Sequence, residues 1–600
     1  MAMRATRPTA PTVRIRRALA AAAAIVVATA GAAAGHAHRA PAPRSVAATH
    51  RAVVDGRLTA ALAAGRPVAA LAILEAQADV QAAGALADKA AKGRYVFDRL
   101  VEVAEVTQRP LRSLLAQRGV PYRPYYIVNA VAFEADAATV AVVAGQAGVT
   151  GIVMMPTFRI DPSWTVDAAG DMAVDARDPA APDGTLEVAV AERNIKAIGA
   201  DKVWRQGYLG AGATVAIIDT GVNARHPALA QRYRGRAEGD DYNWLDAVAG
   251  QNAPVDVNDH GTHVAGIVLG KQGSREVGVA PEAEWIACRI FAQDRGTTQA
   301  ILECLQWALA PTKRDGSAPQ PDRAPDIVNA SWGIFGRLFC DNPFPGEVAI
   351  RNLVAAGILF VAASGNDGPR CGSVCPPASL IDAFAVGNYD DERRSIADTS
   401  SRGPFVQGAV ERIKPDVAAP GENINSTVGT SGFGIKQGTS MAAPHVSGAA
   451  ALLISARPAL SGRPGELRAI LEETADPVNA DQCGPSGARA FNNAAGHGVI
   501  DVEAAVAAAL SLPTATPTAT DAPRPTATAT AAATATGVPS ATARATTTPA
   551  PTTPGATTSA VATATTEWTP TPRPSVPPPT ATRSTPGIPV GRLWLPLLSR

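Results

Sequence analysis

The chain has almost no excess of charge, few aromatic side chains and, beyond its first 37 residues, no apolar run long enough to cross a bilayer. A formal net charge of +1 over 600 residues gives no general electrostatic reason to expect binding to nucleic acid. Aromatic residues make up 5%, whereas Ala, Pro and Thr are abundant, which indicates low-complexity segments beside a globular core. We therefore expect more than one domain, no nucleic-acid partner and no transmembrane segment in the mature chain.

The first 37 residues have the pattern of an export signal. Basic residues between Arg4 and Arg17 precede a small apolar run from Ala18 to Ala34. Ala32-Ala33-Ala34 and Gly35-His36-Ala37 are both candidate cleavage sites. A membrane anchor is the alternative, but the run is short and consists mostly of Ala. We expect a protein that is secreted or attached to the cell surface, where its six cysteines could form disulfides.

Residues 38–190 are rich in Ala and Val and predict a small α+β unit. Tyr126–Phe133 and Val149–Met155 have the pattern of strands, and Ala137–Ala147 has the pattern of a helix between them. Such a unit ahead of an exported enzyme suggests a propeptide, and an independent domain of unknown role is the alternative. Asp161–Gly184 is then expected to be an exposed, cleavable connection.

Residues 191–511 alternate apolar strands and helices, which indicates an α/β domain with a mostly parallel central sheet. Thr214–Ile218 is apolar and β-branched, as expected of a parallel strand buried on both faces, and Asp219 follows it. A carboxylate at the carboxyl end of such a strand points into the ligand crevice. Asp219-Thr220-Gly221 also occurs in aspartic proteases, which need a second aspartate of this kind. The other candidate, Asp398-Thr399-Ser400, lacks the glycine.

A candidate nucleophile and a candidate base follow in the chain. Gly438–Gly448 predicts a tight turn with Ser440 at the start of a buried helix, Met441–Ser455, with Pro444 in its first turn. The N–H groups of a helix start suit an oxygen that becomes negative during acyl transfer, although Ser440 alone could be a simple cap. His260 begins a second buried helix and could supply the base that a serine nucleophile needs.

The histidines allow a second interpretation, in which His260, His263 and His445 bind a metal ion. Hydrolytic zinc sites usually carry a Glu beside the His pair, and here Gly and Thr stand between His260 and His263. We therefore interpret His263 and His445 as packed, hydrogen-bonded structural residues.

Two further stretches follow apolar strands and could complete a cleft. Gly357–Ala363 leads into Ser364, Gly365 and Asn366, and an Asn amide there could donate to an oxyanion. A turn Asn is the alternative. Asp326–Ala330 leads into Ser331, Trp332 and Gly333, small or flat residues that could line a substrate cleft.

Asp219, His260 and Ser440, in this order, resemble the subtilisin family of serine peptidases. The resemblance covers roughly residues 194–508. It is closest to bacillopeptidase F-like members, through Tyr242–Gly250 and Gly278–Pro281. The stretches that carry the family pattern are Val215–Val222, Asp259–Gly266, Asn329–Gly333, Ala362–Gly368 and Gly438–Gly448. The resemblance implies a subtilisin-like three-layer fold, with the preceding α+β unit as an inhibitory propeptide.

The resemblance also implies a role for each candidate residue. Ser440 is the expected nucleophile, His260 the general base and then acid, and Asp219 the residue that orients His260. Asn366 and the backbone N–H of Ser440 are expected to form the oxyanion hole. The expected substrate-binding residues are Ser331, Trp332, Gly333, Ser364 and Gly365.

The family pattern is altered in two places. Many relatives bind structural calcium through an Asp where this chain has Ala228, and the loop Lys271–Val277 is also changed. No cofactor is required for the chemistry, and structural calcium elsewhere in oxygen-rich loops stays open. The cysteines are the second departure, because Cys371 and Cys375 lie where a wall of the specificity pocket should be. Cys288 with Cys304, and Cys340 with either Cys371 or Cys375, are the expected bridges.

Residues 512–586 form a Thr/Pro/Ala-rich spacer that cannot bury a core, and residues 587–600 form a short apolar tail. The tail is either a surface recognition signal or a simple end. The function expected is a secreted serine endopeptidase of protein and peptide substrates, made as an autoprocessed zymogen whose propeptide acts as intramolecular inhibitor and chaperone. Two alternatives are a dedicated processing protease of narrow specificity and a catalytically silent peptide-binding module.

Overall fold

The computed structural model describes residues 51–65, 68–159, 190–333, 340, 344–407, 410–480, 483–484 and 491–513. The predicted export signal at 1–37, the connection at 161–184 and the tail from residue 514 onward lie outside these residues. No helix within the described ranges combines the length and apolar character that crossing a membrane requires.

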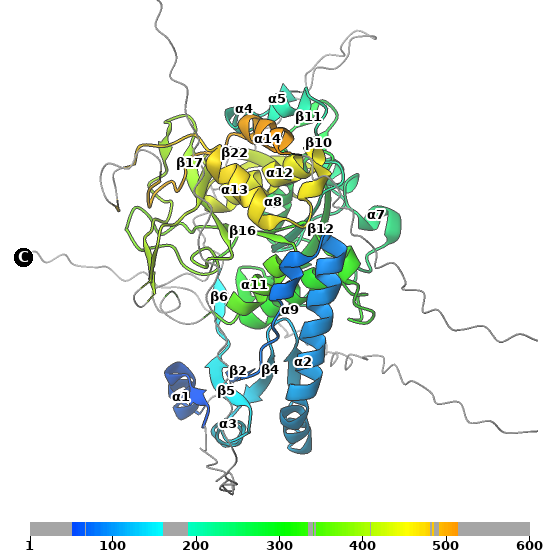
Figure 1. Ribbon diagram of the computed structural model, residues 1–600, viewed down its shortest axis with the longest axis vertical. Helices are drawn as coiled ribbons and strands as arrows, with labels where there is room; N and C mark the ends of the chain where they lie inside the picture. The colour runs from blue at the N-terminus through cyan, green and yellow to red at the C-terminus, as the bar shows by residue number, and fades with distance from the viewer. Residues whose placement is uncertain are drawn as a thin grey trace, which may run out of the picture. The chain divides into compact units, whose positions relative to one another are not determined.

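An eight-stranded sheet forms the centre of residues 190–513, with the order β18-β17-β16-β15-β8-β12-β9 and with β21 paired to β17 (Figure 1). Its pairs are parallel except β17–β18. The strands are β8 Thr214–Asp219, β9 Trp244–Asp246, β12 Glu284–Arg289, β15 Ile327–Ala330, β16 Leu359–Ala363, β17 Phe384–Asp390, β18 Ser395–Ile396 and β21 Val417–Pro420. The α/β fold and mostly parallel sheet expected from the sequence are confirmed.

Alternate residues of β8 enter two different cores, because successive side chains of a strand point to opposite faces of the sheet. Val215 and Ile217 pack in one core with helices α8 (His260–Leu269), α12 (Thr439–Ala456) and α14 (Val502–Ser511). Ala216 and Ile218 pack in the other with α9 (Thr298–Leu309) and α11 (Glu347–Ala355). The result is three layers, with helices on both faces of the sheet.

Residues 51–154 form a second, five-stranded sheet with the order β1-β5-β2-β4-β3. Ala70 and Ala72 of β2 face a core shared with α1, α2 and α3, whereas Leu71 faces the same core as α9 and α11. The amino-terminal sheet therefore packs on the helical layer of the larger sheet. Its elements are β1 Val53–Val54, α1 Gly56–Ala63, β2 Val68–Leu74, η1 Gln81–Ala85, α2 Lys89–Gln117, β3 Tyr122–Tyr125, β4 Ala130–Ala135, α3 Ala137–Ala144 and β5 Val149–Met154.

Short elements complete the described chain. They are β6 Thr157–Arg159, β7 Val190–Ala191, α4 Arg193–Ala197, α5 Ala200–Trp204, α6 Pro227–Ala230, α7 Gly235–Glu238, β10 Lys271–Gln272, β11 Arg275–Glu276, β13 Phe291–Ala292, β14 Arg295–Thr297, η3 Pro321–Arg323, β19 Phe405–Gln407, β20 Val410–Arg412, β22 Ile424–Val428, β23 Gly432–Lys436, η4 Pro458–Leu460 and α13 Pro464–Glu473.

The strand expected at Tyr126–Phe133 begins only at Ala130. Tyr126 and Ile127 instead donate their backbone N–H groups to the side-chain oxygen of Gln306 on α9, at 2.8 and 3.3 Å. Asn352 on α11 donates to the carbonyl of Ile127 at 2.8 Å. At these residues, hydrogen bonds to α9 and α11 replace the strand-to-strand hydrogen bonds that the local pattern predicts.

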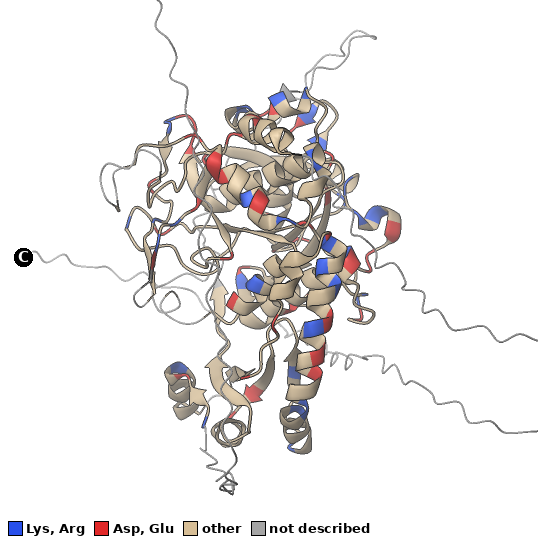
Figure 2. Ribbon diagram, viewed as in Figure 1, with Lys and Arg blue, Asp and Glu red and all other residues tan. Residues whose placement is uncertain are grey.

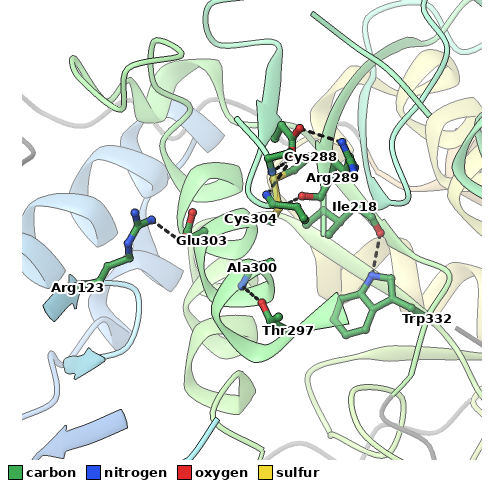
Figure 3. Close-up of a disulfide and its surroundings, with 12 residues drawn as sticks. Arg123, Ile218, Cys288, Arg289, Thr297, Ala300, Glu303, Cys304 and Trp332 are labelled. Carbon is green, nitrogen blue, oxygen red and sulfur yellow. Dashed lines mark hydrogen bonds and ion pairs between the residues drawn. A yellow bond between two sulfur atoms is a disulfide. The ribbon is translucent and has the colours of Figure 1, made fainter. Parts of the chain in front are cut away.

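All six cysteines are in disulfides. Cys288–Cys304 joins β12 to α9, as expected, and Figure 3 shows it beside Arg289, with Arg123 of the amino-terminal unit reaching Glu303 on the same helix. Cys340 pairs with Cys375, one of the two partners that the sequence left open. Cys371 pairs with Cys483, 112 residues away, a bridge that was not among the expected ones.

Candidate active site

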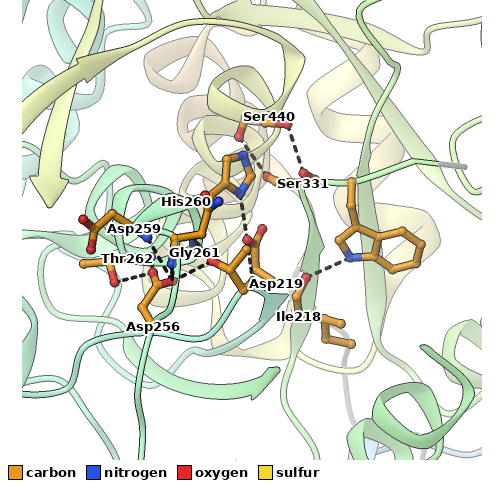
Figure 4. Close-up of polar contacts among 12 residues, drawn as sticks. Ile218, Asp219, Asp256, Asp259, His260, Gly261, Thr262, Ser331 and Ser440 are labelled. Carbon is orange, nitrogen blue, oxygen red and sulfur yellow. Dashed lines mark hydrogen bonds and ion pairs between the residues drawn. The ribbon is translucent and has the colours of Figure 1, made fainter. Parts of the chain in front are cut away.

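Asp219 and His260 meet at the carboxyl edge of the central sheet. Asp219 ends β8, and His260 is the first residue of α8. The His260 Nδ1–H donates to Asp219 Oδ1 at 2.7 Å, and both side chains are buried. Figure 4 shows the imidazole between the Asp219 carboxylate and the Ser440 side chain. An imidazole held at Nδ1 by a carboxylate presents Nε2 as a proton acceptor.

This contact requires a very close approach of two backbone segments. A Cβ built on Gly261 would lie 2.1 Å from the carbonyl oxygen of Gly221 and 3.0 Å from the Cβ of Asp219. Only glycine therefore fits directly after His260, which explains the His-Gly pair in physical terms. The backbone N–H of Gly261 also donates to Thr220 Oγ1 at 2.9 Å, which ties the helix start to the residue after Asp219.

Asp256 organises the same junction, although no motif of the sequence singled it out. Its Oδ1 accepts from Thr220 Oγ1 at 2.8 Å and from the backbone N–H groups of Asn258 and Asp259 at 3.0 Å. Its Oδ2 accepts from the N–H and hydroxyl of Thr262 at 2.7 and 2.6 Å. Burial raises the pKa of Asp256, and these hydrogen bonds oppose that shift. An Asp close ahead of a helix start was the available signal.

Ser440 is the second residue of α12 and is fully buried. Its hydroxyl donates to the carbonyl of Ser331 at 3.0 Å, and the Ser331 hydroxyl donates to the carbonyl of Ser440 at 2.8 Å. The expectation that Pro444 lies in the first helical turn is wrong, because α12 begins at Thr439, two residues earlier than expected. Pro444 cannot donate to the carbonyl four residues before it, which is that of Ser440. The Ser331 hydroxyl donates the hydrogen bond to this carbonyl instead.

Asn366 lies beside Ser440 with its amide oriented. Its Oδ1 accepts from the backbone N–H and the hydroxyl of Thr439, both at 3.0 Å. Its Nδ2 is buried and has no hydrogen-bond partner among the residues that the structure describes. Gly438, with φ of 122°, leaves room for this amide, because a Cβ there would lie 3.2 Å from Nδ2. An oriented, unpaired donor next to a serine could bind a developing oxyanion.

An extended segment of the amino-terminal unit reaches the same edge. Strand β6 pairs antiparallel with β14, with Phe158 opposite Gly296. The Phe158 ring lies 5.5 Å from the Phe291 ring and 6.3 Å from the Trp332 ring, measured between centroids. A Cβ on Gly296 would come within 2.5 Å of Phe158. Trp332 was expected to bind substrate, whereas the role of β14 as a strand-accepting edge was missed.

Comparison with known proteins agrees with this geometry. The model of the subtilase family matches residues 210–498. Subtilisin BL of Lederbergia lenta is 33% identical over 316 residues, which are 52% of this chain and 97% of that protein. The chain belongs to the subtilase family. The resemblance inferred from the sequence is thereby confirmed, and with it membership of a family of serine endopeptidases.

Other subtilases match a similar share of this chain but different shares of their own length. Bacillopeptidase F of Bacillus subtilis is 41% identical over 332 residues, which are 53% of this chain but only 22% of that protein. The major intracellular serine protease of Bacillus subtilis is 33% identical over 275 residues, 45% of this chain and 77% of that protein. The comparisons support neither a role restricted to processing nor a catalytically silent module.

The two other motif histidines of this subtilase bond to backbone carbonyls. His263 Nε2–H donates to the carbonyls of Ile424 and Gly434 at 3.1 and 3.0 Å. His445 Nδ1–H donates to the carbonyl of Met441 at 2.8 Å, so its Nε2 accepts from the amide of Asn194 at 2.7 Å. Burial lowers the pKa of His445 to about 4 and that of His263 well below its ordinary value. Both are therefore neutral, packed side chains at neutral pH.

The residues at the altered family position do not fit calcium. Ala228 offers no carboxylate there, and its N–H donates to His226 Nδ1 at 3.2 Å. In the neighbouring hairpin of β10 and β11, the Lys271 ammonium lies 2.7 Å from Glu276 Oε1, so a protein cation already pairs with that carboxylate. Within the described ranges, no three His, Cys, Asp or Glu side chains gather in a way that could hold a metal ion.

The low pKa of His445 predicts loss of stability in acid. The unfolded chain binds a proton at this residue near pH 6.5, whereas the folded chain does so only near pH 4. Stabilisation that is fully present above pH 6.5 is therefore lost as the pH falls to 4, by about 3 kcal/mol. Urea unfolding midpoints of the Ser440→Ala chain between pH 7.5 and 4 measure this loss. The double variant with His445→Gln should show a shallower dependence, and an unchanged slope would contradict the assignment.

Proposed function

We propose that the chain is a secreted serine endopeptidase that hydrolyses peptide bonds through an acyl-enzyme formed on Ser440. The observation that carries the proposal is the buried 2.7 Å hydrogen bond from His260 to Asp219, beside a serine at a helix start. Burial excludes water and strengthens this contact, and a carboxylate at Nδ1 stabilises the imidazolium that forms when Nε2 takes a proton. Membership of the subtilase family supports peptide-bond hydrolysis as the reaction.

The proposed reaction assigns one step to each group. Ser440 Oγ gives up its bond to the Ser331 carbonyl, donates its proton to His260 Nε2 and attacks the scissile carbonyl carbon. The oxygen that becomes negative accepts hydrogen bonds from Asn366 Nδ2 and the Ser440 N–H. His260 then returns the proton to the leaving amine, and the C–N bond breaks. Water repeats the sequence on the ester and releases the acid product.

Residues 38–190 are proposed to be a propeptide that inhibits and guides the folding of residues 191–511. The pairing of β6 with β14 supports this, because an extended segment then covers the edge on which a substrate backbone would add as a strand. Phe158 lies against Trp332, one of the predicted substrate-binding residues. Ser331, Gly333, Ser364 and Gly365 are proposed to bind substrate beside it.

Export is proposed from two independent features. The amino-terminal 37 residues carry the pattern of a signal, and three disulfides are rare in reducing compartments. We propose that the enzyme is secreted or attached to the cell surface. The Thr/Pro/Ala-rich residues 512–586 would then serve as a spacer, and residues 587–600 as its tail. No metal is needed for the proposed reaction.

Replacing the nucleophile tests both hydrolysis and self-processing. Ser440→Ala should lower peptide hydrolysis about a million-fold, the loss typical of removing a triad serine. It should also leave the precursor uncut, whereas the wild-type product should begin between about Ala180 and Asn194. Intact mass and amino-terminal sequencing of both secreted proteins measure this. Identical maturation of the two would show that another protease does the processing.

Removing the proposed oxyanion donor should slow chemistry more than binding. Asn366→Leu is expected to lower kcat about 10²–10³-fold with little change in KM, because the donor acts on charge present only in the transition state. Steady-state kinetics on a peptide substrate measure the split. Asn425→Leu is the matched control, since that amide donates to Glu192 at 3.0 Å and is assigned no part in the reaction. A rise in KM at constant kcat would refute the role.

A further inference from the structure

Helix α2 contacts the peptidase domain at a third place, apart from the β6–β14 pairing and the packing on α9 and α11, and far from the catalytic residues. Asp219 is the last residue of β8 and Ser331 directly follows β15, so both lie at the carboxyl ends of these strands, whereas Thr214 and Asp326 lie at the amino ends. A six-residue strand is about 17 Å long, which separates the two edges. The helix has 29 residues, a length of about 43 Å, and its first turn lies at the amino edge.

The contact is centred on a buried carboxylate. Asp326 is 6% exposed and accepts from the backbone N–H of Thr214 at 2.9 Å and from the hydroxyl of Ser461 at 2.6 Å. The ammonium of Lys89 lies 2.9 Å from Asp326 Oδ1 and 2.8 Å from the carbonyl oxygen of Ala324. Removing the cation of such a pair leaves a buried charge uncompensated, which is strongly unfavourable.

Neighbouring contacts extend this surface over the first turns of α2. The ammonium of Lys92 donates to the carbonyl of Gly462 at 2.7 Å. A Cβ on Gly462 would lie 2.8 Å from the Cβ of Lys89, so the helix rests directly on this backbone. Arg94 pairs with Asp322 at 2.6 Å, but both side chains are about half exposed and add little. Figure 2 shows residues of both signs along α2, so overall charge attraction does not explain the contact.

We propose that the first turns of α2 form a latch, with Lys89 inserted against Asp326, that keeps the cleaved propeptide bound to the peptidase. The partner of the surface formed by Asp322, Ala324, Asp326, Ser461 and Gly462 is therefore this chain's own amino-terminal unit. The inference rests on the proposed function, since it requires that residues 38–190 are cut from an active enzyme. Several separate contacts on one unit bind far more tightly than any one of them alone. The latch delays activity after processing without contacting Ser440.

The test compares three full-length chains: wild type, Lys89→Met and Arg99→Met. Methionine keeps the apolar stem of each side chain and removes its charge. Arg99 is the matched control, because it pairs with Glu102 on α2 itself. All three chains release the same mature enzyme, so their final rates must agree. Lys89→Met should shorten the lag between processing and activity about 30-fold or more, the usual loss when one partner of a buried charge pair is removed. Equal lags for Lys89→Met and wild type would overturn the latch.

Hydrogen exchange separates failure of the latch from failure of the proposed function. In the uncut Ser440→Ala chain, Lys89→Met should speed amide exchange in the first turns of α2, and Arg99→Met should not. This readout needs neither processing nor activity. Unchanged exchange in the Lys89→Met chain would overturn the latch even if the enzyme behaves as proposed. If Lys89→Met speeds exchange but the chain with wild-type Ser440 proves inactive, the contact is confirmed and only the proposed enzymatic function is rejected.

Discussion

The buried hydrogen bond between Asp219 and His260 sets the geometry of the whole site. It requires a close approach between the backbone after β8 and the backbone at the start of α8. Only glycine fits at position 261, because a Cβ there would lie 2.1 Å from the carbonyl oxygen of Gly221. Asp256 holds that approach through five hydrogen bonds, to Thr220 on one side and to the helix start on the other. A carboxylate at a helix amino-terminus also suits the local field. The proposed base is thus fixed by a rigid junction and not by a mobile loop.

The proposed nucleophile is fixed by a different device. A proline within the first two turns of α12 would normally weaken the helix, yet here it frees the carbonyl of Ser440 for the Ser331 hydroxyl. The segment directly after β15, which carries Ser331, is thereby joined to the helix that carries Ser440. Thr439 orients Asn366 from the same helical turn. The proposed nucleophile Ser440 and the proposed oxyanion donor Asn366 are therefore held together as one unit.

Residue patterns predicted the features that depend on local sequence. They failed for the features that depend on contacts between segments far apart in the chain. The apolar run before Asp219, the helices opened by His260 and Ser440 and the pair Cys288–Cys304 could all be inferred from the sequence. The family and the α/β class followed from them. The conformation at Tyr126 depends on Gln306, which accepts its backbone N–H. The position of Pro444 within α12 depends on Ser331, which bonds to the carbonyl that the proline leaves free. The disulfide of Cys371 depends on a partner 112 residues away. No local pattern contains these contacts. Asp256 looks like an ordinary loop residue until its five donors are seen together.

The central claim is that Ser440 is a nucleophile activated by His260, and active-site labelling tests it most directly. The processed chain is treated with a fluorophosphonate, whose fluoride leaves as a serine oxygen bonds to phosphorus, and the adduct is mapped by peptide mass. The account predicts one adduct, on Ser440. It also predicts far slower labelling of His260→Ala, which cannot process itself and is cut to the same amino terminus by an added protease, while that variant stays folded. An adduct on another serine, or equally fast labelling without His260, would contradict it.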